Sequence, residues 1–228
     1  MKIIAKIYTD FPEKFGIPRQ SGLIEELEGR IVFEKEYRNK DAVRGLEDFS
    51  HIWLLWEFSK AVRDGWSATV RPPLLGGNTR MGVFATRSPF RPNSIGLSCL
   101  KLKRIEYTEE DGPVIYVSGV DMMSGTPVYD IKPYLPYADC RPDATGGFTD
   151  ELPKRELAVN MPEELLEKVS KDKREALLKV LATDPRPSYQ NSPERLYGMS
   201  FAGYEVGFTV DKDILTVENI EIIESNID

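Results

Sequence analysis

Short apolar runs alternate with turns rich in glycine and proline through the first 160 residues of the chain. Almost none of these runs shows the 3.6-residue period of an amphipathic helix. We therefore expect strands at residues 2–9, 29–37, 51–58, 81–86, 94–102, 114–122 and 128–135. Regular short strands joined by such turns are typical of an all-β barrel or sandwich.

Two of these runs carry more detailed information. Residues 51–58 are nearly all apolar, which predicts a strand buried on both faces. In residues 94–102 the apolar positions are odd-numbered up to Cys99 and even-numbered from Leu100 onward. A strand can change parity in this way without losing its buried face only through a bulge or a sharp bend. We expect that irregularity just after Cys99.

The pattern changes in the last third of the chain. Residues 161–182 place leucines and valines at helical spacing among acidic residues and lysines, which predicts one amphipathic helix. Residues 201–210 and 214–223 then read as a β-hairpin. The sequence thus predicts a mainly β protein, with an N-terminal β domain at 1–145 and a small C-terminal α+β domain, a helix plus a hairpin, at 146–228.

Composition matters chiefly through the distribution of charge. The 228 residues carry a net charge of −7, which by itself disfavours a nucleic-acid partner. Between Lys60 and Arg104, however, nine basic residues face one acidic residue, so this segment is near +8 and the rest of the chain near −15. A local basic surface of this kind can bind RNA, although scattered surface charge would give the same count.

Several classes of function are disfavoured by what the sequence lacks. Two cysteines and one histidine make a disulfide framework or a His/Cys zinc site very improbable, and we expect no metal. No apolar run approaches 18 residues, and the charged N-terminus does not resemble a secretory signal, so we expect no membrane span and a cytoplasmic protein. Phosphate-loop, dinucleotide-binding and hydrolase motifs are missing too.

The loop at residues 87–93, between two of the expected strands, is the strongest candidate for a functional site. Its two prolines restrict the backbone, so the side chains of Arg87, Phe90 and Arg91 should be held in fixed positions. Rigid loops at strand ends commonly carry binding and catalytic groups. A proline-rich corner with two solvated arginines is the alternative interpretation.

The same loop carries a family resemblance. ATRSPFRPN at residues 85–93, followed by Ile-Gly-Leu at 95–97, resembles the signature of the TrmO family (also called TsaA or YaeB-like). Further segments match in the same order: PRQ (18–20), DAVRGLEDFSHIWLL (41–55), TVRPPLLGGNTRMG (69–82), SGTPVYDIKPYLPYAD (124–139) and LATDPRPSY (181–189). The resemblance implies a β-barrel domain that forms a homodimer, with S-adenosylmethionine bound near the subunit interface. It also implies methylation of N6 of threonylcarbamoyl-adenosine at tRNA position 37, with the C-terminal domain assisting tRNA binding.

The resemblance assigns cofactor binding to specific positions. They are Pro18, Arg19, Gln20, Ser59, Lys60, Arg87, Leu97 and the segment Ser118, Gly119, Val120 and Asp121. At 59–60 the family usually has His-Gln, so the departure to Ser-Lys leaves backbone contacts possible and puts a side-chain role in doubt. Arg87 could pair with the methionine carboxylate in a bidentate geometry that lysine imitates poorly.

The proposed acceptor nitrogen belongs to a urea-like group and is a poor nucleophile, so a base within hydrogen-bond reach would help to remove its proton. Asp121 and Asp130 are the candidates for that base, although either could equally be a structural hydrogen-bond acceptor. Lys132 or Tyr134 would polarise the neighbouring carbonyl. Candidates for contact with tRNA are Arg91, Arg186 and Tyr189, since phosphates favour arginine and unstacked bases favour aromatic rings.

Two other functions compete with the methyltransferase hypothesis. A non-catalytic nucleotide- or RNA-binding barrel would use the arginine loop to hold phosphate without moving a methyl group. A hydrolase or metal enzyme is disfavoured by the single histidine and the missing motifs.

Overall fold

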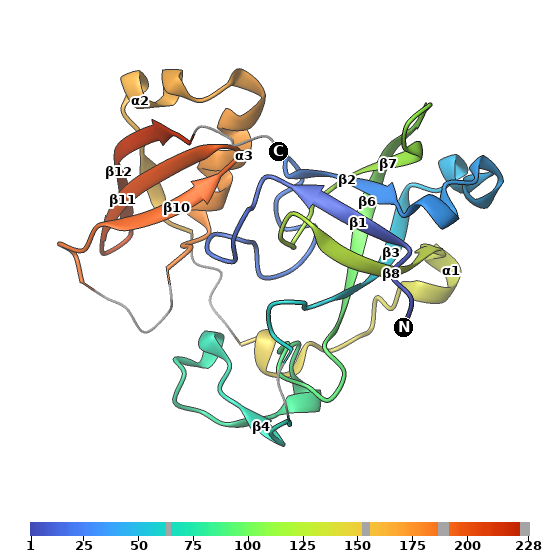
Figure 1. Ribbon diagram of the computed structural model, residues 1–228. Helices are drawn as coiled ribbons and strands as arrows, with labels where there is room; N and C mark the ends of the chain where they lie inside the picture. Colours follow the sequence, from blue (N-terminus) through green and yellow to red (C-terminus); the bar gives the residue numbers. More distant parts are fainter. Residues whose placement is uncertain (63–64, 152–155, 187–191, 224–228) are drawn as a thin grey trace.

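The computed structural model describes residues 1–62, 65–151, 156–186 and 192–223, and its main feature is a closed barrel (Figure 1). The strands follow the order β1-β2-β7-β6-β3-β8, and every neighbouring pair is antiparallel. Their bounds are β1 Ala5–Thr9, β2 Glu28–Phe33, β3 His51–Glu57, β6 Ile95–Thr108, β7 Gly112–Ser118 and β8 Thr126–Pro133. The expectation of a mainly β barrel protein is confirmed.

A second sheet lies beside the barrel and contains the C-terminal residues. Its order is β10-β11-β12-β9, with β9 parallel to β12. The bounds are β9 Ala158–Asn160, β10 Tyr197–Phe201, β11 Tyr204–Asp211 and β12 Ile214–Ile222. The expected hairpin is therefore present as β11 and β12, and the sequence pattern missed the two strands that flank it.

The single helix expected at 161–182 is wrong. The structure has two helices instead, α2 (Glu163–Lys168) and α3 (Lys171–Ala182). Between them Val169 and Ser170 adopt extended backbone angles, with ψ of 135° and 141°. Val169 is 1% exposed, and this break in the helix turns its side chain into the core. A continuous 3.6-residue pattern did not reveal it.

Other expected strands are shorter than the sequence suggested. The run 81–86 is wrong as a strand beyond Gly82, because β5 (Met81–Gly82) pairs only with β4 (Thr69–Val70) and then becomes a 3₁₀ turn. The remaining short elements are α1 (Pro136–Asp139) and 3₁₀ turns at Lys35–Tyr37, Lys40–Val43, Leu46–Asp48, Pro73–Leu75, Val83–Ala85 and Gly147–Thr149. Among the described residues, no helix is long and apolar enough to cross a membrane.

The burial patterns of β3 and β6 also correct the sequence analysis. Strand β3 is buried on one face only, with its alternate residues half-buried on the outer face. In β6 the even-numbered positions from Gly96 to Leu100 face the interior throughout, and Leu97 on the outer face is 54% exposed. The bulge lies between Leu102 and Arg104 rather than after Cys99. The apolar odd-numbered positions at the start of β6 therefore belong to the outer face.

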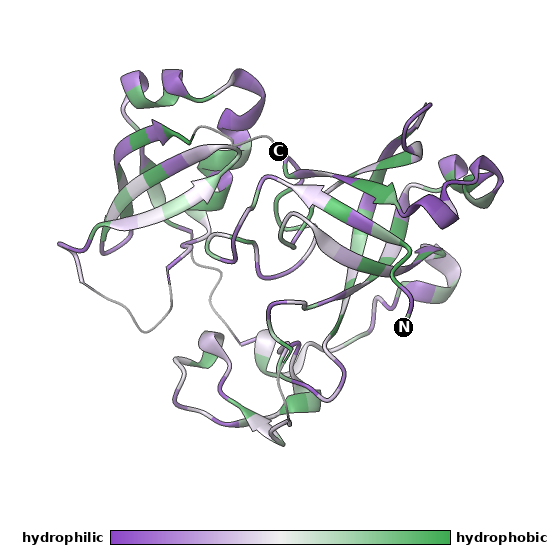
Figure 2. Cartoon of the chain, in the orientation of Figure 1, coloured by the Kyte–Doolittle hydropathy of each residue, from purple (hydrophilic) through white to green (hydrophobic). Residues whose placement is uncertain are grey.

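The segment that follows β1 connects the barrel to the C-terminal sheet. Phe11 packs edge-to-face on Phe201 with 5.4 Å between ring centroids, and Phe15 stacks near Phe208 at 6.4 Å. The Asp10 carboxylate lies 2.7 Å from the Lys173 ammonium on α3. One hydrophobic cluster accordingly runs through both sheets, whose strands carry the hydrophobic residues seen in Figure 2. The division into domains near residue 145 stays a prediction.

Within the barrel, the Trp56 ring lies over Gly96 on the neighbouring strand. Trp56 is 5% exposed, and its indole nitrogen donates a hydrogen bond to Ser98 Oγ at 3.0 Å. A Cβ atom at position 96 would clash with the buried ring, whereas a Cβ at Gly82 on β5 would meet nothing within 4 Å.

We therefore expect Gly96→Ala to lower the free energy of unfolding by about 1–3 kcal/mol, the usual cost of overpacking a core. Gly82→Ala is the matched control, since neither strand glycine has a positive φ, and it should be neutral or slightly stabilising. Urea denaturation measures both. Equal stability of the two variants would contradict the packing of Trp56 on Gly96.

Candidate functional site

Four segments that are distant in sequence meet at one end of the barrel. The Gly22 backbone N–H donates to the Gly119 carbonyl at 2.9 Å, and the Cys99 N–H donates to Ser21 Oγ at 3.2 Å. A guanidinium nitrogen of Arg87 donates to the side-chain oxygen of Gln20. Four segments are thus in direct contact: the loop after β1, the arginine loop (residues 87–93), the start of β6 and the turn after β7.

Asp121 lies at the centre of this cluster. Ser98 Oγ donates to the Asp121 carboxylate at 2.7 Å and itself accepts the hydrogen bond from the Trp56 indole. Ser98 is 1% exposed, so this hydroxyl points inward from β6 rather than into solvent. A chain of hydrogen bonds from indole to hydroxyl to carboxylate therefore fixes the Asp121 side chain.

Burial raises the pKa of Asp121 to about 6. The hydrogen bond from the Ser98 hydroxyl opposes this rise most strongly, because it favours the charged carboxylate. Backbone groups of Asp121 and Ser21 and the positive charge of Arg87 lower the pKa for the same reason. With its pKa near 6, the group is mainly ionised at pH 7 yet accepts a proton far more readily than an ordinary aspartate. That is the property of a general base.

The turn from Ser118 to Asp121 has two further features of a binding site. The Ser118 hydroxyl is buried and has no hydrogen-bond partner among the residues that the structure describes, although buried polar groups are rarely left unpaired. Gly119 has φ +78°, and a Cβ there would lie 3.0 Å from the Gly22 backbone, so this close approach requires glycine. Val120 is 1% exposed in the core, which leaves only its backbone to contact a ligand.

The residues in this cluster fit the chemistry of S-adenosylmethionine. The methionine part of that molecule carries a carboxylate, which calls for a cation in the site. Arg87 supplies this positive charge, and Leu97 presents an apolar surface on β6.

The other expected cofactor residues lie along the edges of the cluster. Pro18 is buried, while Arg19 is exposed on the same loop as Gln20. Ser59 and Lys60 are exposed directly after β3, and the Lys60 carbonyl accepts a hydrogen bond from the Lys14 ammonium at 2.9 Å. Lys60 is therefore tied through its backbone to the loop that carries Gln20.

The structure does not bring Asp130, Lys132 and Tyr134 together with Asp121. All three belong to β8 or follow it, and β3 separates β8 from β6 in the barrel. Asp130 and Lys132 pair with each other at 3.0 Å, while the Tyr134 ring lies 5.9 Å from that of Trp53 on the outer face. Their catalytic roles stay predictions.

The candidate RNA contacts differ in accessibility. The Arg91 guanidinium donates to the carbonyls of Thr86 and Ser88 at 3.2 and 3.5 Å, so it braces the arginine loop. Arg186 is 5% exposed and forms two hydrogen bonds with Asp184, at 2.8 and 2.9 Å. This internal ion pair keeps the guanidinium from solvent. Tyr189 lies outside the described residues.

Sequence analysis missed the residues that hold Asp121 in place. Ser98 is a polar residue at an even-numbered position of β6, between the buried Gly96 and Leu100. A hydroxyl on the buried face of a strand needs an internal partner, and this was the available signal. The phase change at Cys99 obscured it, because it suggested that the odd-numbered positions faced the core.

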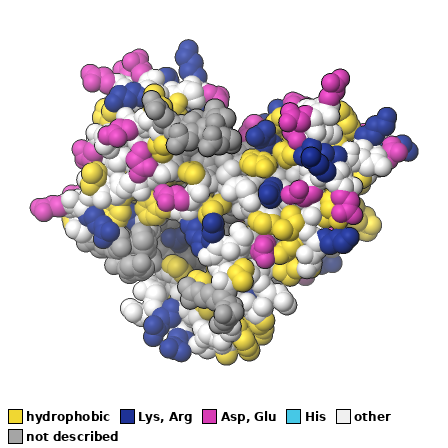
Figure 3. All heavy atoms as spheres, viewed as in Figure 1, with side chains coloured by type: hydrophobic (Ala, Val, Ile, Leu, Met, Phe, Trp, Pro, Cys, Tyr) yellow, Lys and Arg dark blue, Asp and Glu magenta, His cyan; other side chains and the backbone are white. Residues whose placement is uncertain are grey.

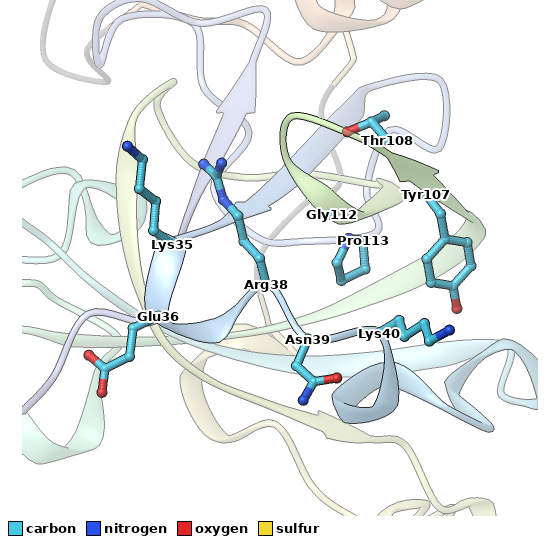
Figure 4. Close-up of a pocket in the computed structure, with 9 residues that line it drawn as sticks. All are labelled: Lys35, Glu36, Arg38, Asn39, Lys40, Tyr107, Thr108, Gly112 and Pro113. Atoms are coloured by element: carbon cyan, nitrogen blue, oxygen red, sulfur yellow. The ribbon is translucent and has the colours of Figure 1, made fainter.

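A separate hollow lies at the opposite end of the barrel (Figure 4). The hollow has a volume of about 590 Å³, and the residues that line it include Lys35, Arg38, Lys40 and Tyr107. The Arg38 guanidinium is held there by the Asp111 carboxylate at 3.1 Å. Strand β7 begins beside this hollow and ends beside Asp121, so the two sites are distinct. Within the described ranges, no group of three or more His, Cys, Asp and Glu side chains could hold a metal ion.

Comparisons with known proteins agree along nearly the whole chain. The family model for the tRNA-methyltransferase O N-terminal domain matches residues 6–140, and the model for the TrmO C-terminal domain matches residues 154–223.

Individual relatives give the same picture. The chain is 43% identical to the tRNA (adenine(37)-N6)-methyltransferase of Escherichia coli K12 over 213 residues, which cover 91% of this chain and 89% of the relative. A relative of the same description from Eikenella corrodens is 45% identical over 177 residues, which cover 77% and 99%. The crystal structure of TrmO from Pseudomonas aeruginosa superposes with a TM-score of 0.76 at 32% identity, covering 96% of this chain and 97% of that one.

We expect Ser98→Ala to raise the pKa of Asp121 further above 6, because it removes the strongest group that favours the carboxylate. Carboxyl carbon NMR measures the titration. Ser50→Ala, at an exposed serine before β3, is the control and should leave the pKa of Asp121 unchanged. An Asp121 midpoint near 4 in the unmodified protein would contradict the effect of burial.

The raised pKa also has a consequence for stability. The folded chain binds a proton at Asp121 more tightly than the unfolded chain does, so this group lowers the free energy of unfolding as the pH rises from about 4 to about 6. The whole loss is about 3 kcal/mol at about 1.4 kcal/mol per pKa unit, and about 2 kcal/mol of it falls between pH 4 and pH 6. Urea denaturation at the two pH values should show the loss in the unmodified protein and its disappearance in Asp121→Asn.

Proposed function

The chain belongs to the tRNA-methyltransferase O (TrmO) family of S-adenosylmethionine-dependent tRNA (adenine-N6)-methyltransferases, and we propose that its acceptor is N6 of threonylcarbamoyl-adenosine at position 37 of tRNA. The observation that supports a catalytic rather than a merely binding role is the Asp121 carboxylate. It is held by Ser98 and has a pKa near neutrality beside a guanidinium group. Plain phosphate binding would need no such group.

Arg87 and Gln20 orient the cofactor in this proposal. S-adenosylmethionine, when bound, supplies the methyl group on its sulfonium sulfur. Arg87 binds the methionine carboxylate, and its hydrogen bond to the Gln20 side chain fixes the direction of the guanidinium plane. Since methyl transfer is an in-line displacement, the main contribution of these residues is to hold the nitrogen and the methyl carbon in near-attack geometry.

Asp121 takes the proton in the reaction. The N6 lone pair forms the new N–C bond while the electrons of the S–C bond stay on sulfur, and the N6 proton moves to the Asp121 carboxylate. Delocalisation into the carbamoyl group makes N6 a poor nucleophile, so proton removal by a nearby base favours the transfer. Asp130, with Lys132 or Tyr134, remains the second candidate, in a site on the outer face of the barrel.

The proposed enzyme works in the cytoplasm as a homodimer. Cys99 and Cys140 are both free, which suits a reducing compartment. Leu97 is more than half exposed on the outer face of β6, next to half-buried residues of β3 and close to the Asp121 cluster. A second copy covering this face would close the site and could bring its own polar groups to it.

Mass spectrometry of tRNA nucleosides tests the acceptor directly. The purified protein is incubated with S-adenosylmethionine and tRNA from cells that lack its gene, and threonylcarbamoyl-adenosine should gain one methyl group. A tRNA transcript with unmodified adenosine at position 37 is the control. Methylation of that transcript would refute the threonylcarbamoyl requirement. Absence of saturable S-adenosylmethionine binding in calorimetry would favour a non-catalytic RNA-binding barrel.

Substitutions at Arg87 and Asp121 should separate binding from turnover. Arg87→Ala should raise the Kd for S-adenosylmethionine about tenfold or more, since it removes a charge-assisted hydrogen bond. Asp121→Asn should mainly lower kcat, by about 10²-fold or more, and should abolish the rise of kcat with pH through about 6. Asp130→Asn tests the second candidate in the same way, and it should leave kcat unchanged if Asp121 is the base. Unchanged turnover in Asp121→Asn would remove Asp121 as the base.

A further inference from the structure

The chain between β3 and β6 forms a lobe with an unusual charge. Residues 65–93 contain four arginines and no acidic residue, in a protein whose net charge is −7. The small sheet of β4 and β5 belongs to this lobe, which projects below the barrel in Figure 1. In Figure 3 the same region shows basic side chains beside hydrophobic ones, and no acidic side chain is visible there on this face.

Two aromatic rings of the lobe are presented to solvent as a pair. Trp66 is 56% exposed and Phe84 is 71% exposed, with 5.9 Å between ring centroids and 31° between ring planes. Their backbones are fixed, because the Val83 N–H donates to the Ala68 carbonyl at 3.0 Å and Val83 itself is 1% exposed. Leaving two large rings exposed side by side is costly unless they have a partner.

Two arginines border the small sheet of the same lobe, Arg71 directly after β4 and Arg80 directly before β5. Arg71 and Arg80 are exposed, and in the described part of the chain neither forms an ion pair. One Arg80 nitrogen donates to Thr69 Oγ1 at 3.2 Å, which ties this side chain to β4. Exposed aromatic rings and exposed cations in one lobe are the features with which proteins bind single-stranded RNA, by stacking bases and contacting phosphates.

We propose that Trp66 and Phe84 form a base-stacking platform, in a lobe that also carries the exposed Arg71 and Arg80, and that this platform binds an unpaired nucleotide of the tRNA next to the methylated adenosine. The platform rests on the proposed function, since it places this nucleotide relative to the cofactor site. Phe84 is three residues before Arg87, so their Cα atoms are at most about 11 Å apart. A base stacked on the platform therefore lies within reach of the methyl-transfer site.

A second copy of this chain is the other possible occupant of the ring pair. Contact of lobe with lobe across a two-fold axis would place the arginines of one copy against those of the other. Such like-charge contact is unfavourable, whereas RNA phosphates neutralise the same charges. The charge of the lobe thus favours RNA.

Leucine substitutions distinguish stacking from apolar burial. Trp66→Leu, Phe84→Leu and the double variant keep an apolar side chain but remove the ring face, and Trp66→Phe keeps a ring. With tRNA from cells that lack the gene, the double variant should raise the KM for tRNA at least about tenfold, as expected for losing base stacking. Its kcat and its Kd for S-adenosylmethionine should change less than about twofold. Trp66→Phe should stay close to the unmodified protein.

Tyr107→Leu is the matched control, because Tyr107 is 58% exposed but lines the hollow at the opposite end of the barrel. It should leave the KM for tRNA unchanged. Arg80→Gln should reduce the slope of log Kd for tRNA against log salt concentration by about 0.7, the value for one phosphate contact on single-stranded nucleic acid.

The outcomes separate the platform from the proposed function. If the unmodified protein methylates tRNA but the double leucine variant keeps the same KM, the platform is wrong while the function stands. If the double variant instead changes the oligomeric state in analytical ultracentrifugation, the rings belong to a contact between copies, and the platform is wrong as well. If the unmodified protein binds tRNA and transfers no methyl group, the proposed function fails, and the loss of tRNA affinity in the leucine variants still tests the platform.

Discussion

The structure depends on the packing of the segment after β1 between the barrel and the C-terminal sheet. Phe11 and Phe15 are fixed against the rings of that sheet, and Asp10 pairs with α3. A few residues later the same segment carries Gln20, which binds Arg87. The C-terminal sheet therefore packs against the segment that leads to the site, although no residue of the sheet contacts Arg87 through a described hydrogen bond.

Within the site, burial and hydrogen bonding have opposite effects on the pKa of Asp121. Enclosure raises its pKa, and the hydrogen bond from Ser98 limits the rise. Ser98 in turn is oriented by the Trp56 indole, whose ring needs the space that Gly96 leaves. Gly96, which has no polar side-chain atom, is thus connected to the Asp121 carboxylate through three successive contacts. Buried polar networks have this property because an unpaired member is costly.

The sequence predicted the architecture better than the details of the site. The spacing of short apolar runs between turns was sufficient to locate the barrel strands, although the burial of β3 and the position of the bulge in β6 were wrong. It failed where tertiary contacts decide, as at Val169, whose burial breaks the expected helix. Family resemblance pointed to Gln20, Arg87 and Asp121, which the fold does bring together. No local pattern could show that Arg186 is held by Asp184 in the interior.

The lobe between β3 and β6 combines two functions that a methyltransferase without a nucleotide-binding fold requires, namely cofactor binding and RNA binding. Its final loop carries Arg87, to which we assign cofactor binding, and the ring pair of Trp66 and Phe84 lies next to its small sheet in the sequence. Because one proline-rich segment carries both, an RNA base bound on the rings and a cofactor bound at Arg87 would be positioned by the same backbone. The positive charge is concentrated on this segment, while the rest of the chain is acidic. The acidic surface therefore need not repel the RNA next to the proposed methyl-transfer site.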